Sequence, residues 1–239
     1  MRIPLDLSDA FTLMAAMGVG AIVDDAVRGV RLSVTPDAAT IDAGALTDTD
    51  IARIVHEHAV TRAAGSWVAE VGSLDGAARA PLSPRIGMPS SAASWETLQR
   101  QRHASIDAIL RDQRLDTRFV GALGEPAYWA RGRDRVVVDF GANAWEMKTR
   151  NRGEEFVQNR RALLAASVAA RSESQVLAGL TGASVRDEGG KDASTSRTPT
   201  GLRAPGRSDN ALAWCALWAM SLFPVRPVMS GAGPTARRS

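Results

Sequence analysis

Cysteine and lysine are scarce in this chain of 239 residues, which has one cysteine and two lysines. The lone Cys215 excludes a disulfide within the chain and a zinc site built from several cysteines. The two lysines accompany 27 arginines and 41 alanines. Because genomes rich in G and C favour arginine and alanine codons, the arginine count alone does not predict nucleic-acid binding. With 45% hydrophobic and 23% charged residues, the composition is that of a soluble intracellular globular protein.

Long apolar runs are scarce too. The run from Phe11 to Val23 has the length of a signal-peptide core, but Asp6 and Asp9 precede it and Asp24 and Asp25 follow it. These acids, and the lack of a small-residue cleavage pattern, favour a buried helix over an export signal. The run is shorter than the roughly eighteen apolar residues of a membrane span. We therefore expect a cytoplasmic protein without membrane contact.

Motifs of enzyme chemistry are also missing. The sequence has no Gly-x-Ser-x-Gly turn, no Walker phosphate loop and no Gly-x-Gly-x-x-Gly after a strand. His56 and His58 point roughly 200° apart on a helix and cannot share a metal, so we expect His58 in the core and His56 in solvent. Cys215 lies in a very apolar segment, where a thiol is inert. We predict no catalytic residue, no metal and no cofactor.

Periodicity predicts an α+β fold with mixed short strands and about five helices. Alternating apolar residues indicate strands, and apolar residues at helical spacing indicate helices. The last helix is apolar on nearly all sides, so we expect this Trp-rich C-terminal helix to be buried. The expected helices are residues 9–22, 48–59, 94–111, 153–171 and 208–222, and the expected strands are residues 3–7, 30–34, 40–42, 67–71, 119–123 and 135–140.

Composition divides the chain into four parts, which we expect to form one domain. Residues 1–75 are an acidic α/β part and residues 76–180 are a basic α+β part, and a long loop is expected over residues 72–94. Residues 181–207 contain almost nothing apolar, which predicts a flexible loop. Residues 208–239 are the buried helix and a polar tail.

Charge is placed unevenly along the chain. Residues 1–75 carry 5 basic and 11 acidic residues, whereas residues 76–239 carry 24 basic and 15 acidic ones. Such asymmetry is typical of a surface that meets a polyanion, and equally of two ordinary solvated surfaces. The position of the basic residues therefore matters more than their number.

The most specific basic stretch is WEMKTRNRGEEFVQNRR, residues 145–161. Lys148, Arg150 and Arg152 alternate just before a helix that begins at Gly153, so three cations adjoin a helix end that can bind an anion. Two glutamates follow that glycine, and the alternative is that they cap the helix and pair with the arginines. The stretch predicts either a phosphate contact or an internal ion-pair cluster.

Arg160 presents the same choice between a phosphate contact and an internal ion pair. On a helical wheel it falls within the apolar face of Phe156, Val157, Leu163 and Leu164. A buried guanidinium needs a partner. The more common partner is a carboxylate of the same chain. The alternative is a phosphate of a bound nucleic acid, reached across the edge of the core, which makes Arg160 a binding residue.

A second basic stretch is SRTPTGLRAPGR, residues 196–207. Arg197, Arg203 and Arg207 accompany several hydroxyl side chains there. Charge and donors on a mobile backbone suit sequence-independent phosphate contacts, although such loops are also often simply solvated.

Read with DNALAWCALW at residues 209–218 and the opening IPLDLSDAFTLMAAMGVGAI, the two basic stretches resemble proteins of type I-U (I-G) CRISPR loci. The resemblance spans most of the chain and is to the accessory or large-subunit-like component of the surveillance complex. It implies a non-catalytic subunit that contacts CRISPR RNA or target DNA and neighbouring subunits, with cleavage done by a separate helicase-nuclease. The nucleic-acid-binding candidates are Lys148, Arg150, Arg152, Arg197 and Arg203, from the resemblance, and Arg160, from the helical wheel.

The sequence departs from this resemblance after Val225. A polar tail containing glycine and arginine follows, where further structured sequence is expected. The departure predicts a copy that is truncated or frameshifted near its end. Two alternatives stay open: a structural or interaction protein without nucleic-acid contact, and a hydrolase whose site is made of scattered loop residues.

Overall fold

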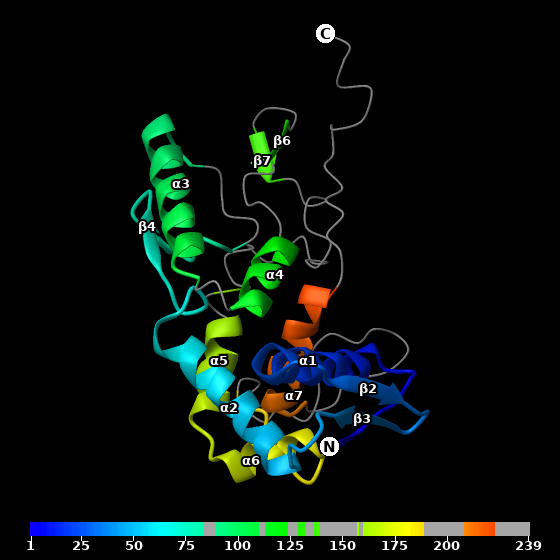
Figure 1. The fold of residues 1–239 in the computed structure, drawn as a ribbon. Helices are drawn as coiled ribbons and strands as arrows, with labels where there is room; N and C mark the ends of the chain where they lie inside the picture. The colour runs from blue at the N-terminus through cyan, green and yellow to red at the C-terminus, as the bar shows by residue number, and fades with distance from the viewer. Residues whose placement is uncertain are drawn as a thin grey trace. The chain divides into compact units, whose positions relative to one another are not determined.

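The computed structural model describes residues 1–83, 89–109, 113–123, 129–131, 136–138, 157, 160–188 and 208–222. Within these residues there are seven α-helices and seven short strands, and every strand pairing is antiparallel (Figure 1). The fold is therefore mixed α+β and rich in helix, as the periodicity predicts, with two helices more than the expected five.

Two compact units make up the chain. Unit 1 comprises residues 1–64 and 163–222, and unit 2 comprises residues 65–162 and 223–239. Each unit is considered separately below. The division of the chain into four parts by composition stays a prediction.

The sheet of unit 1 has the strand order β1-β3-β2. Strand β1 is Arg2–Pro4, β2 is Arg31–Val34 and β3 is Ala38–Asp42. The strands β2 and β3 form the hairpin that the alternating residues predict, with Leu32 opposite Ile41. Because Ile3, Ala39 and Ile41 are buried, one face of this sheet is part of the core.

Three helices of unit 1 begin at side-chain caps, and α1 and α7 begin where the sequence predicts. Asp9 accepts a hydrogen bond from the Phe11 amide and caps α1, and Asp209 does the same for the Ala211 amide of α7. Ser172 and Gln175 form a capping box at the start of α6. The helices are α1 Ala10–Val27, α2 Asp48–Gly65, α5 Ala162–Ala169, α6 Glu173–Leu180 and α7 Asn210–Ala219, followed by a 3₁₀ turn, η2, at Met220–Leu222.

Helices α1 and α7 form the centre of unit 1. Trp214, Cys215 and Trp218 of α7 are fully buried, which confirms the expected buried Trp-rich helix. A Cβ atom on Gly18 of α1 would overlap the backbone carbonyl of Cys215, so the two helix backbones are in direct contact. Of the described residues, α1 is the one helix long and apolar enough to cross a membrane, and 39% of it is buried in the protein; a buried core helix has the same length and composition.

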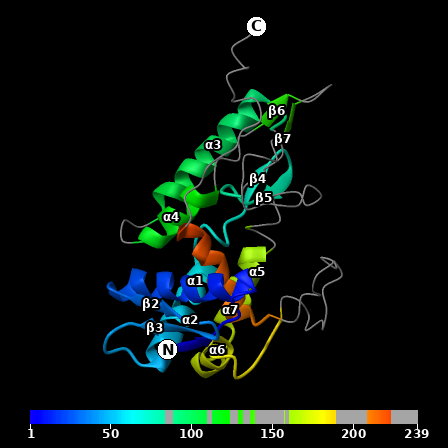
Figure 2. The same cartoon turned by 90° about the vertical axis from the view of Figure 1, so that its right-hand side faces the viewer.

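Unit 2 combines two hairpins with two helices. The strands β4 (Gly72–Leu74) and β5 (Ala77–Arg79) pair beside α3 (Ala92–Asp107), as Figures 1 and 2 show. Leu98 of α3 packs against Leu74 of β4, with Trp95 beside them. The other elements are α4 Arg114–Leu123, β6 Trp129–Arg131 and β7 Val136–Val138.

Three predicted elements of unit 2 are wrong. Residues 67–69 are a turn and residues 70–71 have no regular structure, so the expected strand is absent, and the β4–β5 hairpin lies inside the expected long loop. Its turn is Asp75-Gly76, with both residues at positive φ, a dipeptide that favours tight hairpins. Residues 119–123 are the end of α4 rather than a strand. Leu115, Phe119 and Ala122 are buried at helical spacing, but five residues alone are too few to reveal that period.

Candidate functional site

Of the six predicted nucleic-acid contacts, the structure describes one. Lys148, Arg150, Arg152, Arg197 and Arg203 lie outside the described residues. Arg160 is the one candidate that the structure describes, and it belongs to unit 2.

The expected burial of Arg160 is wrong, because its neighbour Arg161 is the buried one. Arg160 is exposed, whereas Arg161 is fully buried. The regular α-helix begins only at Ala162, so a wheel extended back from Leu163 to Phe156 is out of phase. Leu163, also assigned to the apolar face, is 57% exposed. Arg160 therefore faces solvent, as a contact with an outside anion requires.

Arg161 is held in an aromatic site of unit 2. Its guanidinium carbon lies 3.3 Å from the centre of the Phe119 ring and 4.9 Å from that of Trp67. A guanidinium stacks well on aromatic faces because it is planar and weakly hydrated. Residue type alone did not distinguish Arg160 from Arg161 in the sequence.

Asp116 completes this buried site. The Trp67 indole N–H donates a 2.8 Å hydrogen bond to Asp116 Oδ1, and Asp116 is 1% exposed. Asp116 also lies in the first turn of α4, where the helix dipole favours a carboxylate. The acidic residue of α4 is thus directed inward.

Replacing Trp67 by phenylalanine removes this hydrogen-bond donor and keeps an aromatic ring beside Arg161. We expect W67F to lower the free energy of unfolding by about 1–3 kcal/mol, since a buried carboxylate loses a donor. Urea denaturation measures the loss. The matched control is W95F, since Trp95 is only partly buried. Equal losses in the two variants would contradict a specific role for the Trp67–Asp116 bond.

The outer face of α4 is basic. Its exposed residues are Arg114, Thr117, Arg118 and Gly121, whereas Leu115, Asp116 and Phe119 face the core. The two arginines are one helical turn apart, and a Cβ on Gly121 would meet nothing within 4 Å. This face presents two cations and an open stretch of backbone, without a carboxylate, and the Thr117 hydroxyl donates to the Gln113 carbonyl at 3.3 Å.

The formal charge also differs between the two units. Unit 2 contains 18 basic and 12 acidic residues, a formal charge of +6, whereas unit 1 contains 11 basic and 14 acidic residues, a formal charge of −3. The net positive charge is therefore concentrated in unit 2, whereas residues 163–222 of the basic part of the sequence belong to the acidic unit 1.

Two of the three histidines, His56 and His58, make hydrogen bonds within unit 1. His58 is 7% exposed, and its Nδ1 accepts a 3.2 Å hydrogen bond from the Trp214 indole, which confirms its place in the core. His56 is half-buried rather than in solvent, and its Nε2 donates to the Ala169 carbonyl at 3.2 Å. No group of three or more His, Cys, Asp or Glu side chains among the described residues could hold a metal ion.

The side chains of Cys215 and Ser94 are both held within the fold. Cys215 is fully buried, and burial raises the pKa of its thiol well above the usual range, so a thiolate does not form there. The Ser94 hydroxyl donates to Asp75. This bond, with further hydrogen bonds from Ser90, lowers the pKa of Asp75. A carboxylate so stabilised is a weak base, and it ties the β4–β5 turn to the start of α3.

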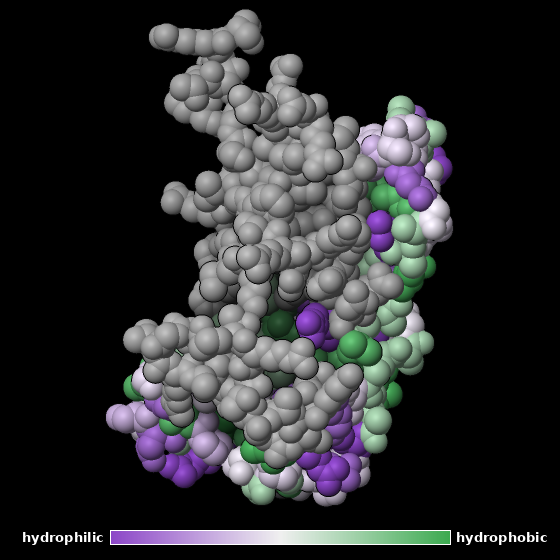
Figure 3. Space-filling model, turned by 180° about the vertical axis from the view of Figure 1, so that it is seen from behind, coloured by the Kyte–Doolittle hydropathy of each residue, from purple (hydrophilic) through white to green (hydrophobic). Residues whose placement is uncertain are grey.

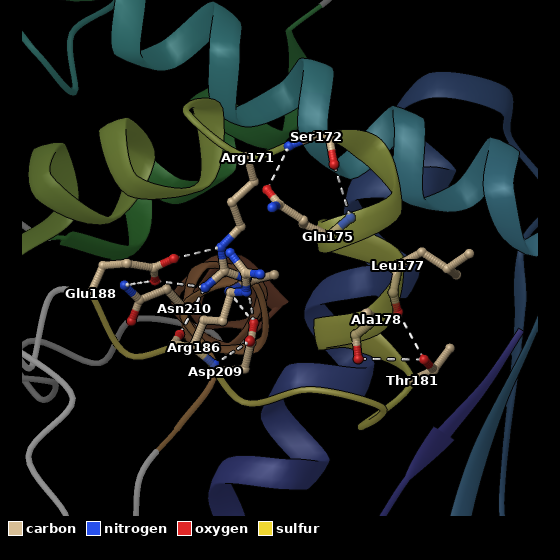
Figure 4. A network of polar contacts seen from close by, with 11 residues as sticks. Arg171, Ser172, Gln175, Leu177, Ala178, Thr181, Arg186, Glu188, Asp209 and Asn210 are labelled. Atoms are coloured by element: carbon tan, nitrogen blue, oxygen red, sulfur yellow. Dashed lines mark hydrogen bonds and ion pairs between the residues drawn. The ribbon is translucent and has the colours of Figure 1, made fainter.

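A polar network lies in unit 1 around Arg171, which is 5% exposed. Its guanidinium donates to Asp209 Oδ1 at 2.8 Å and to both carboxylate oxygens of Glu188 at 2.7 and 3.1 Å (Figure 4). The Arg186 carbonyl accepts a further bond at 2.7 Å, and Asn210 donates to Glu188. The network joins the segment after α5, residues 186–188 and the start of α7, and each guanidinium nitrogen of Arg171 donates to a protein group.

The surface of the described residues is mixed. Figure 3, seen from behind, shows hydrophilic and apolar residues interspersed on the described part of that face. A comparison with protein-family models, one with curated proteins and one with solved structures each found no match to this chain.

Proposed function

We propose that this chain is a non-catalytic subunit of a prokaryotic CRISPR defence complex that contacts the backbone of CRISPR RNA or target DNA. The resemblance to type I-U (I-G) components motivates the complex. Other subunits are its protein partners, and a separate nuclease performs the cleavage. A CRISPR array or a helicase-nuclease gene beside the gene for this chain supports the proposal, and a neighbourhood with neither counts against it.

The observation that carries the nucleic-acid part is the concentration of positive charge in unit 2. A polyanion is attracted by a basic surface, while the acidic unit 1 is unsuited to it and can face other subunits. Contacts to phosphate need cations and donors rather than a fixed geometry, and they read no sequence.

The outer face of α4 provides such groups. Arg114 and Arg118 are separated by one turn, about 6 Å along the helix, which is close to the spacing of neighbouring phosphates on one strand. Arg160 adds an exposed cation in the same unit. We infer that these three arginines, with Lys148, Arg150 and Arg152, contact the backbone.

A binding assay tests this proposal. We expect the chain, alone or with its genomic neighbours, to bind single-stranded RNA or DNA with an affinity that falls steeply with salt. Replacing Arg114, Arg118 and Arg160 together by alanine should reduce the slope of log K against log salt by about 2, at about 0.7 per lost phosphate contact. Fluorescence anisotropy over a salt series measures both quantities.

The matched control replaces three exposed arginines of unit 1, Arg2, Arg31 and Arg53, and should leave the slope unchanged. A second triple variant, with alanine at Lys148, Arg150 and Arg152, should weaken binding equally across sequences. No binding at low salt by the wild-type chain or its complex overturns the proposed function. An equal loss of slope in the unit 1 triple and in the triple of Arg114, Arg118 and Arg160 means that binding reflects the total charge of the chain and not the surface of unit 2.

The alternative, a structural or interaction protein, is favoured by one observation in unit 1. Leu32 and Val34, on the edge strand of its sheet, are 37% and 43% exposed. If the chain acts only through such contacts, the substitutions in unit 2 leave nucleic-acid binding unchanged, and changes at this edge alter assembly.

A further inference from the structure

The two edges of the unit 1 sheet differ. At the β1 edge, Ile3 is 0% and Leu5 is 7% exposed. At the β2 edge all four residues, Arg31–Val34, are exposed. An exposed edge strand is a ready site for pairing with another strand.

The direction of the backbone groups follows from the β2–β3 register. The Thr35 N–H donates to the Ala38 carbonyl at 2.8 Å, so odd-numbered residues of β2 bond to β3. In an antiparallel ladder the bonding direction alternates, so the N–H and C=O groups of Leu32 and Val34 point to the outer edge. The Val30 N–H, which also points outward, is taken by Asp24 Oδ1 at 3.1 Å. The edge available for pairing is therefore centred on Ser33.

The side chains at this edge extend the core face of the sheet. Leu32 lies opposite Ile41 and Val34 opposite Ala39, and residues opposite one another point to the same face. Ile41 and Ala39 are 1% and 0% exposed, whereas Leu32 and Val34 are 37% and 43% exposed. The apolar face thus continues past the point at which the chain covers it.

We propose that two copies of this chain pair through β2, antiparallel about a two-fold axis at Ser33, so that their sheets join into one of six strands. In this register Leu32 of each copy lies opposite Val34 of the other. The outward groups of these two residues then form four backbone hydrogen bonds, and the two Leu–Val pairs cover the exposed apolar edge. A register centred on Leu32 would instead require the Val30 N–H that Asp24 already uses.

The charges at this edge are self-complementary in the same register. Arg31 of each copy lies opposite Thr35 of the other. The Thr35 hydroxyl donates to Asp37 Oδ1 at 2.9 Å, so Arg31 approaches the Asp37 carboxylate, which also pairs with Arg2 of its own copy through Oδ2 at 2.7 Å. By symmetry this contact occurs twice. A second copy of the chain therefore fits the edge in apolar pattern, hydrogen bonding and charge, independently of the proposed nucleic-acid contact.

Cysteine cross-linking tests the register on the full chain. Opposite residues of a pair that is not hydrogen-bonded have Cα atoms about 4.5 Å apart, within the reach of a disulfide. S33C should therefore form a covalent dimer under copper phenanthroline. The control R31C places its two cysteines about 13 Å apart, four residues along the strand, and should not. Both substitutions are at exposed sites, and the native Cys215 is buried.

Sedimentation velocity tests the dimer without a cross-link. The wild type should form a species of twice the 25.3 kDa chain mass as concentration rises. V34K should stay monomeric, and V60K, a valine of α2 that is 39% exposed, should dimerise like the wild type. A wild type that is monomeric throughout the micromolar range, cross-linking of R31C equal to that of S33C, or pairing only with a different protein each overturns the proposal.

Discussion

Replacing Gly18 by alanine is expected to lower the free energy of unfolding by about 3 kcal/mol, the upper end of the usual cost of overpacking. A Cβ atom at this position would overlap the backbone carbonyl of Cys215. Backbone cannot rotate away as a side chain can, so α1 and α7 must move apart. That movement loosens the packing of Trp214 and Trp218 beside Cys215. Chemical denaturation followed by tryptophan fluorescence measures the loss.

Gly20, on the same helix, gives the matched control. A Cβ there would lie 3.8 Å from the Ile41 side chain, an ordinary van der Waals contact. Because alanine is the better helix former by about 1 kcal/mol, G20A should be neutral or stabilising. A G18A loss no larger than the G20A effect would contradict the direct backbone contact between α1 and α7.

Elements with a strong local signal could be predicted from the sequence. Asp9 caps α1 where an acid precedes an apolar run, and the alternation around residues 35–37 is the β2–β3 hairpin. The predicted Trp-rich helix is buried because it has almost no polar side. In each case a few neighbouring residues fix the structure by capping or by period.

Other elements depend on partners distant in the sequence. The region 119–123 has the composition of a strand, but Phe119 packs over Arg161, 42 residues away, as part of a helix. The helix α6 is different, because it begins at a local signal, the Ser172–Gln175 capping box. It lies between the expected helix 153–171 and the expected loop 181–207, and no helix is expected there. The difference in burial between Arg160 and Arg161 depends on where α5 begins, which no local pattern indicates.

The candidate site was predictable only as charge. The basic excess after residue 75 is visible in the sequence, and the structure divides the whole-chain charge of +3 into +6 for unit 2 and −3 for unit 1. The outer face of α4 is not predictable from the sequence when residues 119–123 are expected to be a strand, because a strand places Arg114 and Arg118 on no common helix face. With α4 as a helix, the spacing of Arg114 and Arg118 follows directly, and Asp116 lies on the opposite side, against Trp67.

Replacing Arg171 by methionine is expected to destabilise unit 1 by about 3–5 kcal/mol, the usual cost of removing one partner of a buried ion pair. The side chains of Arg171 and Asp209 are 2% and 1% exposed, so the substitution leaves a carboxylate buried without its cation. Asp209 also caps α7, which links this loss to the central helix. The control is R186M, because Arg186 has an exposed side chain and joins the network through its backbone. It should cost under about 0.5 kcal/mol.

The loss caused by R171M should also depend on pH. Burial by itself raises the pKa of Glu188, but hydrogen bonds from Arg171 outweigh it and hold the pKa below the ordinary 4.5. A carboxyl with a lowered pKa in the folded state stabilises the protein above its unfolded pKa, and this contribution disappears as pH falls through the folded pKa. The difference in unfolding free energy between wild type and R171M should therefore be largest at neutral pH and shrink below about pH 4.5.

The difference in unfolding free energy between wild type and R171M reports on the Arg171 network and not on the other carboxylates. Asp37, Asp50 and Asp75 also have lowered pKa values, through hydrogen bonds from Thr35, Thr47 and Ser94 respectively, but both proteins retain them and they cancel in the difference. Urea denaturation of wild type, R171M and R186M between pH 3 and pH 7 measures how this difference in unfolding free energy depends on pH. A difference that stays constant as the pH falls would mean that Arg171 stabilises the chain by packing rather than by its charge.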